Sequence, residues 1–565
     1  MVARDNSHSH HLLALSEMLA HIFEFLRYNK YDLWSCSLVN KQWLTIVNPV
    51  LWRNPTFSSK RSIKAFQRAI LENKEIAKLV IELNTDRYKR HEIHPLAELT
   101  AHLPCLEHIH FSAAHYTSIL PYKREASSLT SLKGIQYLEI SPKDIGWRSL
   151  MMVLINSPHL EKLGLLINGD LHLTLDTIPL DFPCLSALSS LDLQYFPQSA
   201  SSEFFQRLFS FMPNLRRLKL YSFFISSDIV KVISQHCHHL EALHLISAFM
   251  PDDITAHKIF DYISTNQFRQ NLREFWLNLV NYTQYIGALD IPCELMNRFC
   301  DTLSHVDELQ LCGITFNHGT MRYFASNISK NLRSFKLSKV YCRDIQGVFS
   351  TQVWDTLFHR CGDQLEHLAI EYLELPPTIG EIIAHRCVNL RSLCFRYTTV
   401  SDDSILNITR ALGGKLQHLE LRNTSLSTAG LNSVFSHCQR LEYLDVGDRL
   451  TRPTIGENFF REFILRCGDL LSHISLIDCC ITNSHVDCIA QVCWNLHVFK
   501  LANQPALSDD GINRLLKRCR RLESLQILQE PHVSNGLTIE TITRNVPRWV
   551  EATLDPYAWA RTVVD

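Results

Sequence analysis

The most regular feature of the chain is a recurring pattern of apolar positions: a leucine, two variable residues, a leucine, one variable residue and a third leucine. Clear copies read LRRLKL from Leu215, LEALHL from Leu240, LQHLEL from Leu416 and LESLQI from Leu522. Because successive side chains of a strand point to opposite faces, the leucines of each L-x-L are predicted to face inward and the residue between them outward. Such a strand is too short to be stable unless it stacks on its neighbours.

The pattern keeps a nearly constant period over most of the chain. About seventeen copies, strict or loose, begin between Ile76 and Leu522, and neighbouring copies are most often 25 or 26 residues apart. A fixed period of this length is typical of a solenoid. The sequence therefore predicts an α/β fold with parallel strands on a concave face and helices on a convex face.

The segments between the strands have helical periodicity. The stretch SDDGINRLLKRC from Ser508 to Cys519 begins with residues that can cap a helix, and the same plan begins at Ser401. Its apolar residues follow the spacing i, i+3, i+4, i+7, which predicts one buried helix face: Ile512, Leu515, Leu516 and Cys519.

Cysteines recur at one position of the repeat. Seven copies carry a cysteine three or four residues before the first leucine of the strand, which predicts a ladder of small buried side chains: Cys237, Cys361, Cys387, Cys438, Cys467, Cys493 and Cys519. In number and spacing the copies resemble the cysteine-containing class of leucine-rich repeats over residues 76–530. The resemblance implies a curved solenoid.

The N-terminal segment has a different pattern. Residues 15–26 are predicted to form a helix with one apolar stripe, residues 28–31 break it, and Asp32 is placed to cap a second helix. A third short helix is predicted to carry Trp43 and Ile46, with Pro49 opening its last turn. These roughly 45 residues are too few for a large core of their own.

Read as a whole, residues 12–57 resemble an F-box. The matching residues occur in the family's order: Leu15, Met18 or Leu19, Ile22–Phe23, Leu26, Asp32–Leu33, Cys36 to Val39, Lys41–Gln42–Trp43 and Leu51–Trp52. One position departs from the family, because Ser16 stands where a proline is usual. A proline at a helix start mainly presets φ, and a serine there can cap the same turn.

The F-box resemblance implies docking to a Skp-type adaptor and, through it, to a cullin in a ubiquitin ligase. The residues implied at the adaptor interface are Leu15, Met18, Ile22, Phe23, Leu26, Leu33, Cys36, Val39 and Trp43. Trp34, Trp43 and Trp52 are either interface anchors or core. The alternative for the whole segment is a helical cap that shields the first repeat.

The repeats predict a second binding surface, lined by the outward residue of each L-x-L. Its charges are mixed in sign, which favours a protein or peptide target over nucleic acid. The residues predicted to contact the target are Lys219, His244, Trp276, Gln310, Lys336, Glu420, Asp445 and Lys500. Trp276 is of a frequent hot-spot type, although it is as compatible with the core as with a contact. The unusual stretch Val280–Leu295 directly follows it and is expected to form a loop.

Composition narrows the classes of partner. The chain has 56 lysines and arginines against 57 aspartates and glutamates, so no basic surplus favours nucleic acid or an anionic membrane. The polar N-terminus does not look like a signal peptide, and no apolar run approaches the ~18 residues of a membrane span. We expect a cytoplasmic or nuclear protein whose 18 cysteines remain reduced.

Candidate chemistry is sparse. The cysteines lack the close ligand pairs of a zinc site, and none has an evident base nearby, so neither metal, cofactor nor catalytic residue is predicted. The histidines at 8–11 fit a polar tail, and the basic run near Lys517 fits a helix end. A cysteine-dependent transferase remains the enzyme alternative.

The sequence as a whole predicts five parts: a tail at 1–11, an F-box at 12–57, a linker helix at 58–75, a solenoid at 76–530 and a C-terminal cap or tail at 531–565. The predicted function is that of a non-catalytic substrate receptor that promotes ubiquitin-dependent degradation. The alternative is a leucine-rich scaffold for protein–protein interaction without an adaptor.

Overall fold

The chain is described here by a computed structural model. It covers residues 7–26, 30–55, 60–84, 102–110, 136–140, 154–166, 184–196, 201–222, 224–247, 253–265, 268, 271–279, 289–342, 348–502, 504, 506–528, 546 and 551–555. These residues fall into two compact units. The first comprises Met1–Ser222 with Gln235–His239, and the second comprises Phe223–Ser234 with Leu240–Asp565.

The first unit opens with five helices: α1 (Ser7–Phe25), α2 (Lys30–Ser37), α3 (Lys41–Arg53), α4 (Lys60–Glu72) and α5 (Lys74–Leu79). Asn40 caps α3 with its side-chain oxygen, which accepts a 2.9 Å hydrogen bond from the Trp43 N–H. The three short helices expected before residue 55 are therefore present, and the linker contains two helices rather than one.

Two local expectations in this segment were wrong. Helix α1 begins at Ser7, so residues 7–11 are helical and Ser16 lies inside the helix rather than at a cap. No glycine or proline interrupts that stretch. Asp32 lies within the first turn of α2, where its charge suits the helix dipole. Pro49 lies inside α3, about one turn before its end at Arg53, where the last turn was expected to begin.

The helices lead directly into the first strands of the repeat. The Arg53 carbonyl at the end of α3 accepts a 3.0 Å hydrogen bond from the Ile81 N–H, just before β1. The strands of this unit are β1 (Glu82–Asn84), β2 (His108–His110), β3 (Tyr137–Ile140), β4 (Lys162–Leu166), β5 (Ser190–Phe196) and β6 (Arg217–Ser222), and helix α8 (Ser202–Ser210) precedes β6. They pair in parallel, each with the next.

The expected start of the repeats at Ile76 was wrong by four residues. Ile76 belongs to α5, and Leu83 pairs with Ile109 in the first strand pair. The first repeat is therefore anchored at Val80, which is fully buried. The pattern from Ile76 is apolar, but it follows the period of a helix.

The second unit alternates strands and helices. Its main strands are β7 (Ala242–Ser247), β8 (Glu274–Leu279), β10 (Glu308–Cys312), β12 (Ser334–Ser338), β14 (His367–Glu371), β15 (Ser392–Arg396), β16 (His418–Arg422), β17 (Tyr443–Gly447), β18 (His473–Ile477), β19 (Val498–Ala502), β20 (Ser524–Leu528) and β21 (Glu551–Asp555). The helices are α9 (Ser227–His236, whose last residues group with the first unit), α10 (Asp253–Ile263), α12 (Cys293–Thr302), α13 (His318–Asn327), α14 (Thr351–Cys361), α15 (Ile379–Arg386), α16 (Asp402–Leu412), α17 (Thr428–His437), α18 (Glu457–Cys467), α19 (Asn483–Val492) and α20 (Asp509–Arg518).

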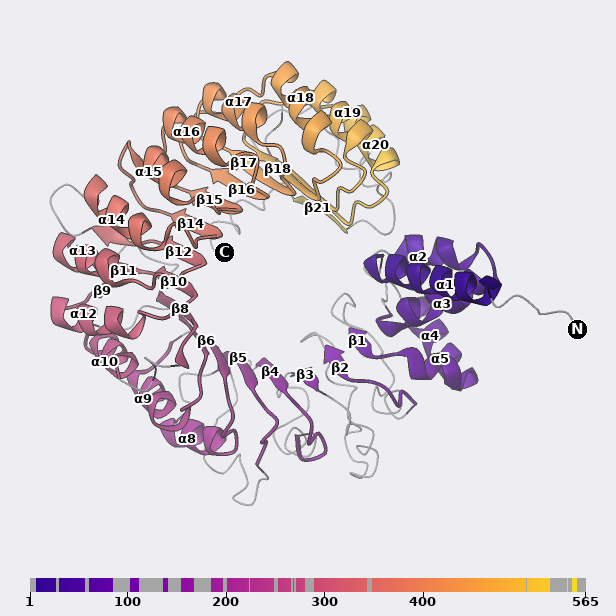
Figure 1. Cartoon of the computed structure of the whole chain (residues 1–565), viewed down its shortest axis with the longest axis horizontal. Helices are drawn as coiled ribbons and strands as arrows, with labels where there is room; N and C mark the ends of the chain where they lie inside the picture. The colour runs from indigo at the N-terminus through magenta and orange to yellow at the C-terminus, as the bar shows by residue number, and fades with distance from the viewer. Residues whose placement is uncertain are drawn as a thin grey trace, which may run out of the picture. The chain divides into compact units, whose positions relative to one another are not determined.

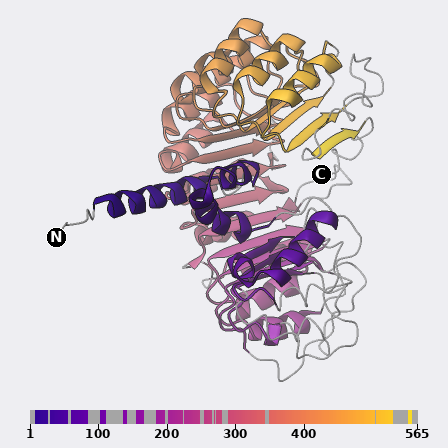
Figure 2. The same ribbon diagram turned by 90° about the vertical axis from the view of Figure 1, so that its right-hand side faces the viewer.

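Within this unit the helices line the outer side of an arc and the strands its inner side (Figure 1). Figure 2 shows the strands edge to edge, with helices on one face of the sheet. The expected α/β solenoid is thus confirmed. The helix expected from Ser508 is α20, and Ser401 caps α16 by accepting a 3.1 Å hydrogen bond from the Ser404 N–H.

Neighbouring strands pair in parallel with one constant register. Leu393 pairs with Leu419, Leu419 with Leu444, and Leu444 with Ile474, so each inward aliphatic side chain stacks on the next. β21 continues this ladder, because Ser524 pairs with Glu551 and Leu528 with Asp555. The sheet therefore extends past the expected end at residue 530.

Several strands are followed directly by a residue with left-handed backbone. Lys339, Tyr372, Tyr397, Asn423 and Asp478 have φ between 48° and 55°. The N–H of each donates to the last strand carbonyl of the following repeat, at 2.9–3.2 Å. This bond turns the chain out of the sheet and ties each repeat to the next.

The cysteine ladder lies where the sequence predicts it. All seven cysteines are buried at the ends of the helices. Two thiols also donate to the preceding member of the ladder: Cys467 Sγ lies 3.4 Å from the Cys438 carbonyl oxygen, and Cys519 Sγ lies 3.6 Å from that of Cys493. A cysteine fits here because a larger side chain would separate the repeats.

The longer repeats add a small second sheet. It contains β9 (Leu289–Asp290), β11 (Ile314–Phe316) and β13 (Tyr341–Cys342). Of the unusual stretch Val280–Leu295, residues 280–288 lie outside the described residues, and the remainder forms β9 and the start of α12.

Gly447 offers a sharp test of the strand register. Its φ is +146°, and a Cβ at this position would overlap the carbonyl oxygen of Ile477 on the next strand. We expect Gly447→Ala to lower the free energy of unfolding by about 3 kcal/mol or more, since both backbone strain and steric overlap oppose it. Gly414→Ala is the matched control, because an added Cβ there meets nothing within 4 Å. Equal urea midpoints for the two variants would contradict the register.

Candidate functional site

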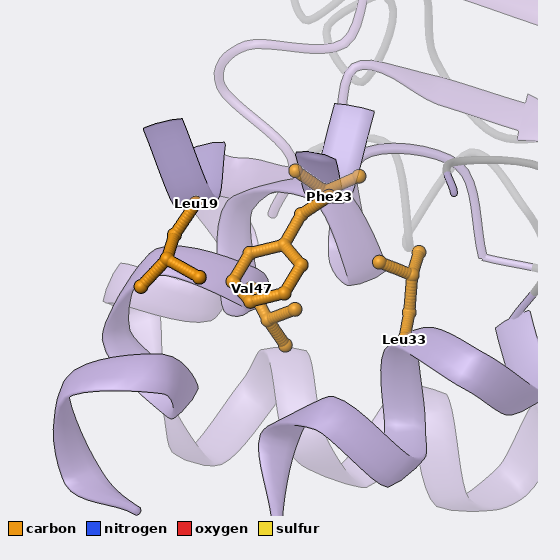
Figure 3. Packing of buried hydrophobic residues seen from close by; sticks show 5 residues of the cluster. Leu19, Phe23, Leu33 and Val47 are labelled. Atoms are coloured by element: carbon orange, nitrogen blue, oxygen red, sulfur yellow. The ribbon is translucent and has the colours of Figure 1, made fainter. Parts of the chain in front are cut away.

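The N-terminal helices are held together by a small apolar cluster. It consists of Leu19, Phe23, Leu33, Val47 and Val50, and it joins α1, α2 and α3 (Figure 3). Phe23 is fully buried, and its ring meets that of Trp43 edge-on, with centroids 5.3 Å apart. This cluster fixes the relative positions of the three helices.

Helix α1 carries a second apolar stripe beside the buried one. Leu19, Phe23 and Leu26 face the cluster, whereas Met18 and Ile22 are 62% and 50% exposed. Phe25 continues the exposed stripe at 91%. Large apolar side chains at i, i+4 and i+7 on the outside of a helix indicate a binding surface.

The neighbouring helices add to this surface. Trp34 on α2 is 53% exposed, and Leu38 and Val39, directly after α2, are 66% and 57% exposed. Leu44 on α3 is 40% exposed. We call Met18, Ile22, Phe25, Trp34, Leu38 and Val39 the exposed apolar set.

The nine residues predicted for the adaptor interface divide by burial. Met18, Ile22 and Val39 are exposed, and Phe23 and Leu33 are fully buried, which leaves the latter two no surface for a partner in this structure. Leu26, Cys36 and Trp43 are partly buried against the cluster, and Leu15 lies in α1 with its side chain outside the described set. Phe25 was missed, because a single helical stripe drawn from the sequence merges the two faces of α1. Leu38 was missed as well, and it lies directly after α2.

Polar contacts reinforce the helix arrangement. The Gln42 side-chain N–H donates to Ser16 Oγ at 3.2 Å, which joins α1 to α3 at the position where the family has proline. Arg53 Nη1 lies 3.4 Å from Glu24 Oε1 and joins the other end of the same helices. Both contacts are exposed, so each contributes little to stability.

The outward strand residues of the second unit form one continuous row. The register aligns them strand by strand: His244, Trp276, Gln310, Lys336, Ala369, Cys394, Glu420, Asp445, Ser475, Lys500 and Gln526. Seven of the eight residues predicted for the target surface lie in this row. The eighth, Lys219, occupies the same position in the first unit, where its Nζ lies 3.2 Å from Asp192 Oδ2.

Trp276 lies on the strand face and not in the core behind it. Its ring stacks on that of His244 at 3.9 Å with an interplanar angle of 2°. His244 Nε2 is 2.7 Å from Glu274 Oε1, and both of these side chains are 13% exposed. The tryptophan is therefore a half-buried surface ring held by its neighbours.

A second ring column crosses β16, β17 and β18. His418 stacks on Tyr443 at 3.9 Å, and Tyr443 stacks on His473 at 4.1 Å. Burial lowers the pKa of His418, and burial, Lys500 and His418 together lower the pKa of His473 to about 4. Both imidazoles are therefore neutral at neutral pH.

Beside this column, acidic and basic side chains alternate between strands. Arg396 on β15 pairs with Glu420 on β16, and Arg422 Nε lies 3.8 Å from Asp445 Oδ1 on β17. Burial raises the pKa of Asp445 to about 6, although Arg422 opposes the shift. Glu420 and Asp445, both predicted to contact the target, are buried beside arginines and are hardly exposed to solvent.

The ladder cysteines are buried and are poor nucleophiles in this fold. Burial raises the pKa of Cys237, Cys361 and Cys519 to about 12, and it raises that of Cys387, Cys438 and Cys493 further. Within the described part of the chain, no three histidine, cysteine or acidic side chains gather as metal ligands. No helix there is long and apolar enough to cross a membrane.

The F-box-like family model matches residues 16–58, a range that contains the second half of α1 and the whole of α2 and α3. The F-box protein SKIP19 of Arabidopsis thaliana is 28% identical over 127 residues, and the match spans 22% of this chain and 38% of that protein. The chain thus carries an F-box-like domain.

Two solved structures are similar to most of the chain. A chain in the Rad7 and Elc1 complex in yeast gives a TM-score of 0.42 at 16% identity, over 86% of this chain and 98% of that one. A chain of the TLR13–ssRNA13 complex gives 0.34 at 14% identity, over 82% and 84%. Both TM-scores are below 0.5, too low to indicate a shared function.

The pKa of His473 gives a testable pH dependence. The unfolded chain takes up a proton near pH 6.5, whereas folded His473 resists protonation until about pH 4, so stability is lost as the pH falls through this window. We expect His473→Phe to keep the ring stack while reducing the fall in Tm between pH 7 and pH 4.5. The same fall in the parent and the variant would contradict a buried neutral imidazole.

The cysteine ladder predicts a labelling pattern. Brief treatment of the folded protein with iodoacetamide at pH 7.5 should modify the exposed Cys105, Cys184 and Cys293 and spare the seven ladder cysteines. Peptide mass spectrometry measures the modified fraction. Rapid labelling of one ladder cysteine would instead favour a cysteine-dependent enzyme.

Proposed function

We propose that this chain, an F-box-like domain at residues 16–58 followed by a leucine-rich-repeat solenoid, is a substrate receptor of a Skp–cullin–F-box ubiquitin ligase. The F-box-like domain binds a Skp-type adaptor, and the adaptor links it to a cullin. The solenoid binds a target protein, whose ubiquitination leads to degradation.

The exposed apolar set carries the adaptor half of the proposal. Six large exposed apolar side chains on α1, on α2 and directly after α2 are costly in water and are typical of a surface that another protein covers. The buried cluster holds α1, α2 and α3 in place, and each of the six side chains is at least 50% exposed.

The strand face supports the target half. Its outward rows combine aromatic rings with charges of both signs, a composition that suits a protein surface. Trp276 is half-buried and braced by His244, as an interface anchor requires. The same mixture gives nucleic acid or a membrane surface no continuous basic track.

The proposed mechanism is proximity. The receptor raises the effective concentration of target lysines near a ubiquitin-charged enzyme, and the chemistry belongs to other subunits. The raised pKa values of the ladder cysteines support a non-catalytic role. Such a complex would act in the cytoplasm, the nucleus or both.

Adaptor binding is the direct test. We expect the purified chain to bind a Skp-type adaptor in a pull-down, and Ile22→Asp with Leu38→Asp to lower the affinity at least about a hundredfold, since two charges would be buried in an apolar interface. Both sites are exposed, so the variant should keep the Tm of the parent.

Leu465→Asp is the matched control, because Leu465 is 63% exposed on α18, outside the F-box-like domain. It should bind the adaptor as the parent does. No adaptor binding by the folded parent would overturn the ligase role and leave the scaffold for protein–protein interaction.

A further inference from the structure

Six side chains, which lie on β12, β15 and β16 or directly after β12, β14 and β15, form a surface of cations and rings. We call Lys336, Lys339, Arg396, Arg422, Tyr372 and Tyr397 the strand-end patch. The cationic side chains of Lys336, Arg396 and Arg422 are 35%, 38% and 24% exposed. The two tyrosines are 41% and 47% exposed.

Three carboxylates lie beneath this patch. The side chains of Glu371, Glu420 and Asp445 are only 11%, 8% and 4% exposed. Glu371 Oε1 lies 2.8 Å from Lys336 Nζ, and the other two carboxylates face Arg396 and Arg422. The acids thus form a buried layer that orients the cations, and the cations meet solvent.

The tyrosines occupy a position that the backbone does not favour for them. Tyr372 and Tyr397 have φ of 54° and 50°, while the same turn position holds Asn423 and Asp478 in later repeats. Asparagine and aspartate suit left-handed backbone, whereas a bulky aromatic residue there is a strained choice. Their rings nevertheless stack at 4.4 Å, with Lys339 Nζ 5.2 Å from the Tyr372 centroid.

We propose that the strand-end patch binds an acidic segment of the target protein, through aspartate or glutamate carboxylates next to an apolar residue. Arg396 and Arg422 form charge-assisted hydrogen bonds to the carboxylates, and the tyrosine pair packs against the apolar side chain. The proposal deepens the proposed function, because it gives the chemistry of the target segment.

The charge of the site favours carboxylates over a phosphate group. The four cations of the patch and the three carboxylates beneath it carry together a net charge of only +1 when every group is ionised. The arginines already share their donors with Glu420 and Asp445. A singly charged, planar carboxylate fits this modest surplus better than a phosphate of charge near −2.

Fluorescence anisotropy with defined peptides tests the proposal on the full-length chain. The probe is a fluorescein-labelled peptide with four glutamates around one phenylalanine, and its comparisons replace the glutamates with glutamine or with phosphoserine. We expect the glutamate peptide to bind at least about tenfold more tightly than the glutamine peptide, and more weakly at high salt. Equal binding of the glutamate and glutamine peptides, or tighter binding of the phosphoserine peptide, would overturn the proposal.

Two double variants locate the site. Tyr372→Asn with Tyr397→Asn removes the rings while suiting the left-handed backbone, so the fold should be kept. Arg396→Gln with Glu420→Gln removes both members of one pair and leaves no buried carboxylate without its arginine. Each should weaken binding of the glutamate peptide about tenfold or more. Unchanged affinity in the folded tyrosine variant would overturn the proposal.

Matched controls lie on the helix side of the same unit. Arg461→Gln removes an exposed cation of α18, and Trp494→Asn removes a ring that is 67% exposed. Both should bind the peptide as the parent does. Adaptor pull-down on the same preparations separates the two proposals: adaptor binding without peptide selectivity overturns the patch alone, whereas selectivity without adaptor binding overturns the ligase role alone.

Discussion

The structure depends on the stacking of strands too short to stand alone. A strand such as β15 spans five residues and turns only Leu393 and Phe395 inward. Two side chains cannot offset the entropy lost on ordering a whole repeat, so each strand is stable only between neighbours. Parallel pairing at about 4.8 Å then places equivalent residues of successive repeats in van der Waals contact.

Because of this spacing, the residues at one position of successive repeats form a row, and each residue of the row contacts its neighbours in the adjacent repeats. The ladder cysteines, the His418–Tyr443–His473 column and the Arg396–Glu420 pair all join neighbouring strands or helix ends. Removing one member of a buried pair therefore disturbs two repeats, because the charge left behind is neither solvated nor paired.

The features that depend only on the two-residue period of strands or the 3.6-residue period of helices could be predicted from the sequence. Two-residue alternation placed Trp276 and Lys336 on the strand face, and helical periodicity gave α20 its buried side. It did not separate the faces of α1, since Met18 and Leu19 are both apolar and only the packing of α3 decides which is covered. Nor did it show that Glu420 and Asp445 are buried, because their burial depends on side chains of other strands. Arg396 and Arg422 follow the same two-residue alternation, so their position on the strand face could have been predicted from the sequence.

The two proposed binding surfaces differ in physical character, and the difference suits their roles. The exposed apolar set gains affinity from burial of hydrocarbon, which salt barely weakens and which favours a lasting complex. The strand-end patch relies on half-exposed cations that buried carboxylates already hold. The carboxylates of a ligand therefore share the arginine N–H donors with Glu420 and Asp445. Such a contact is selective and reversible. A receptor that stays on its adaptor while successive targets leave requires this asymmetry.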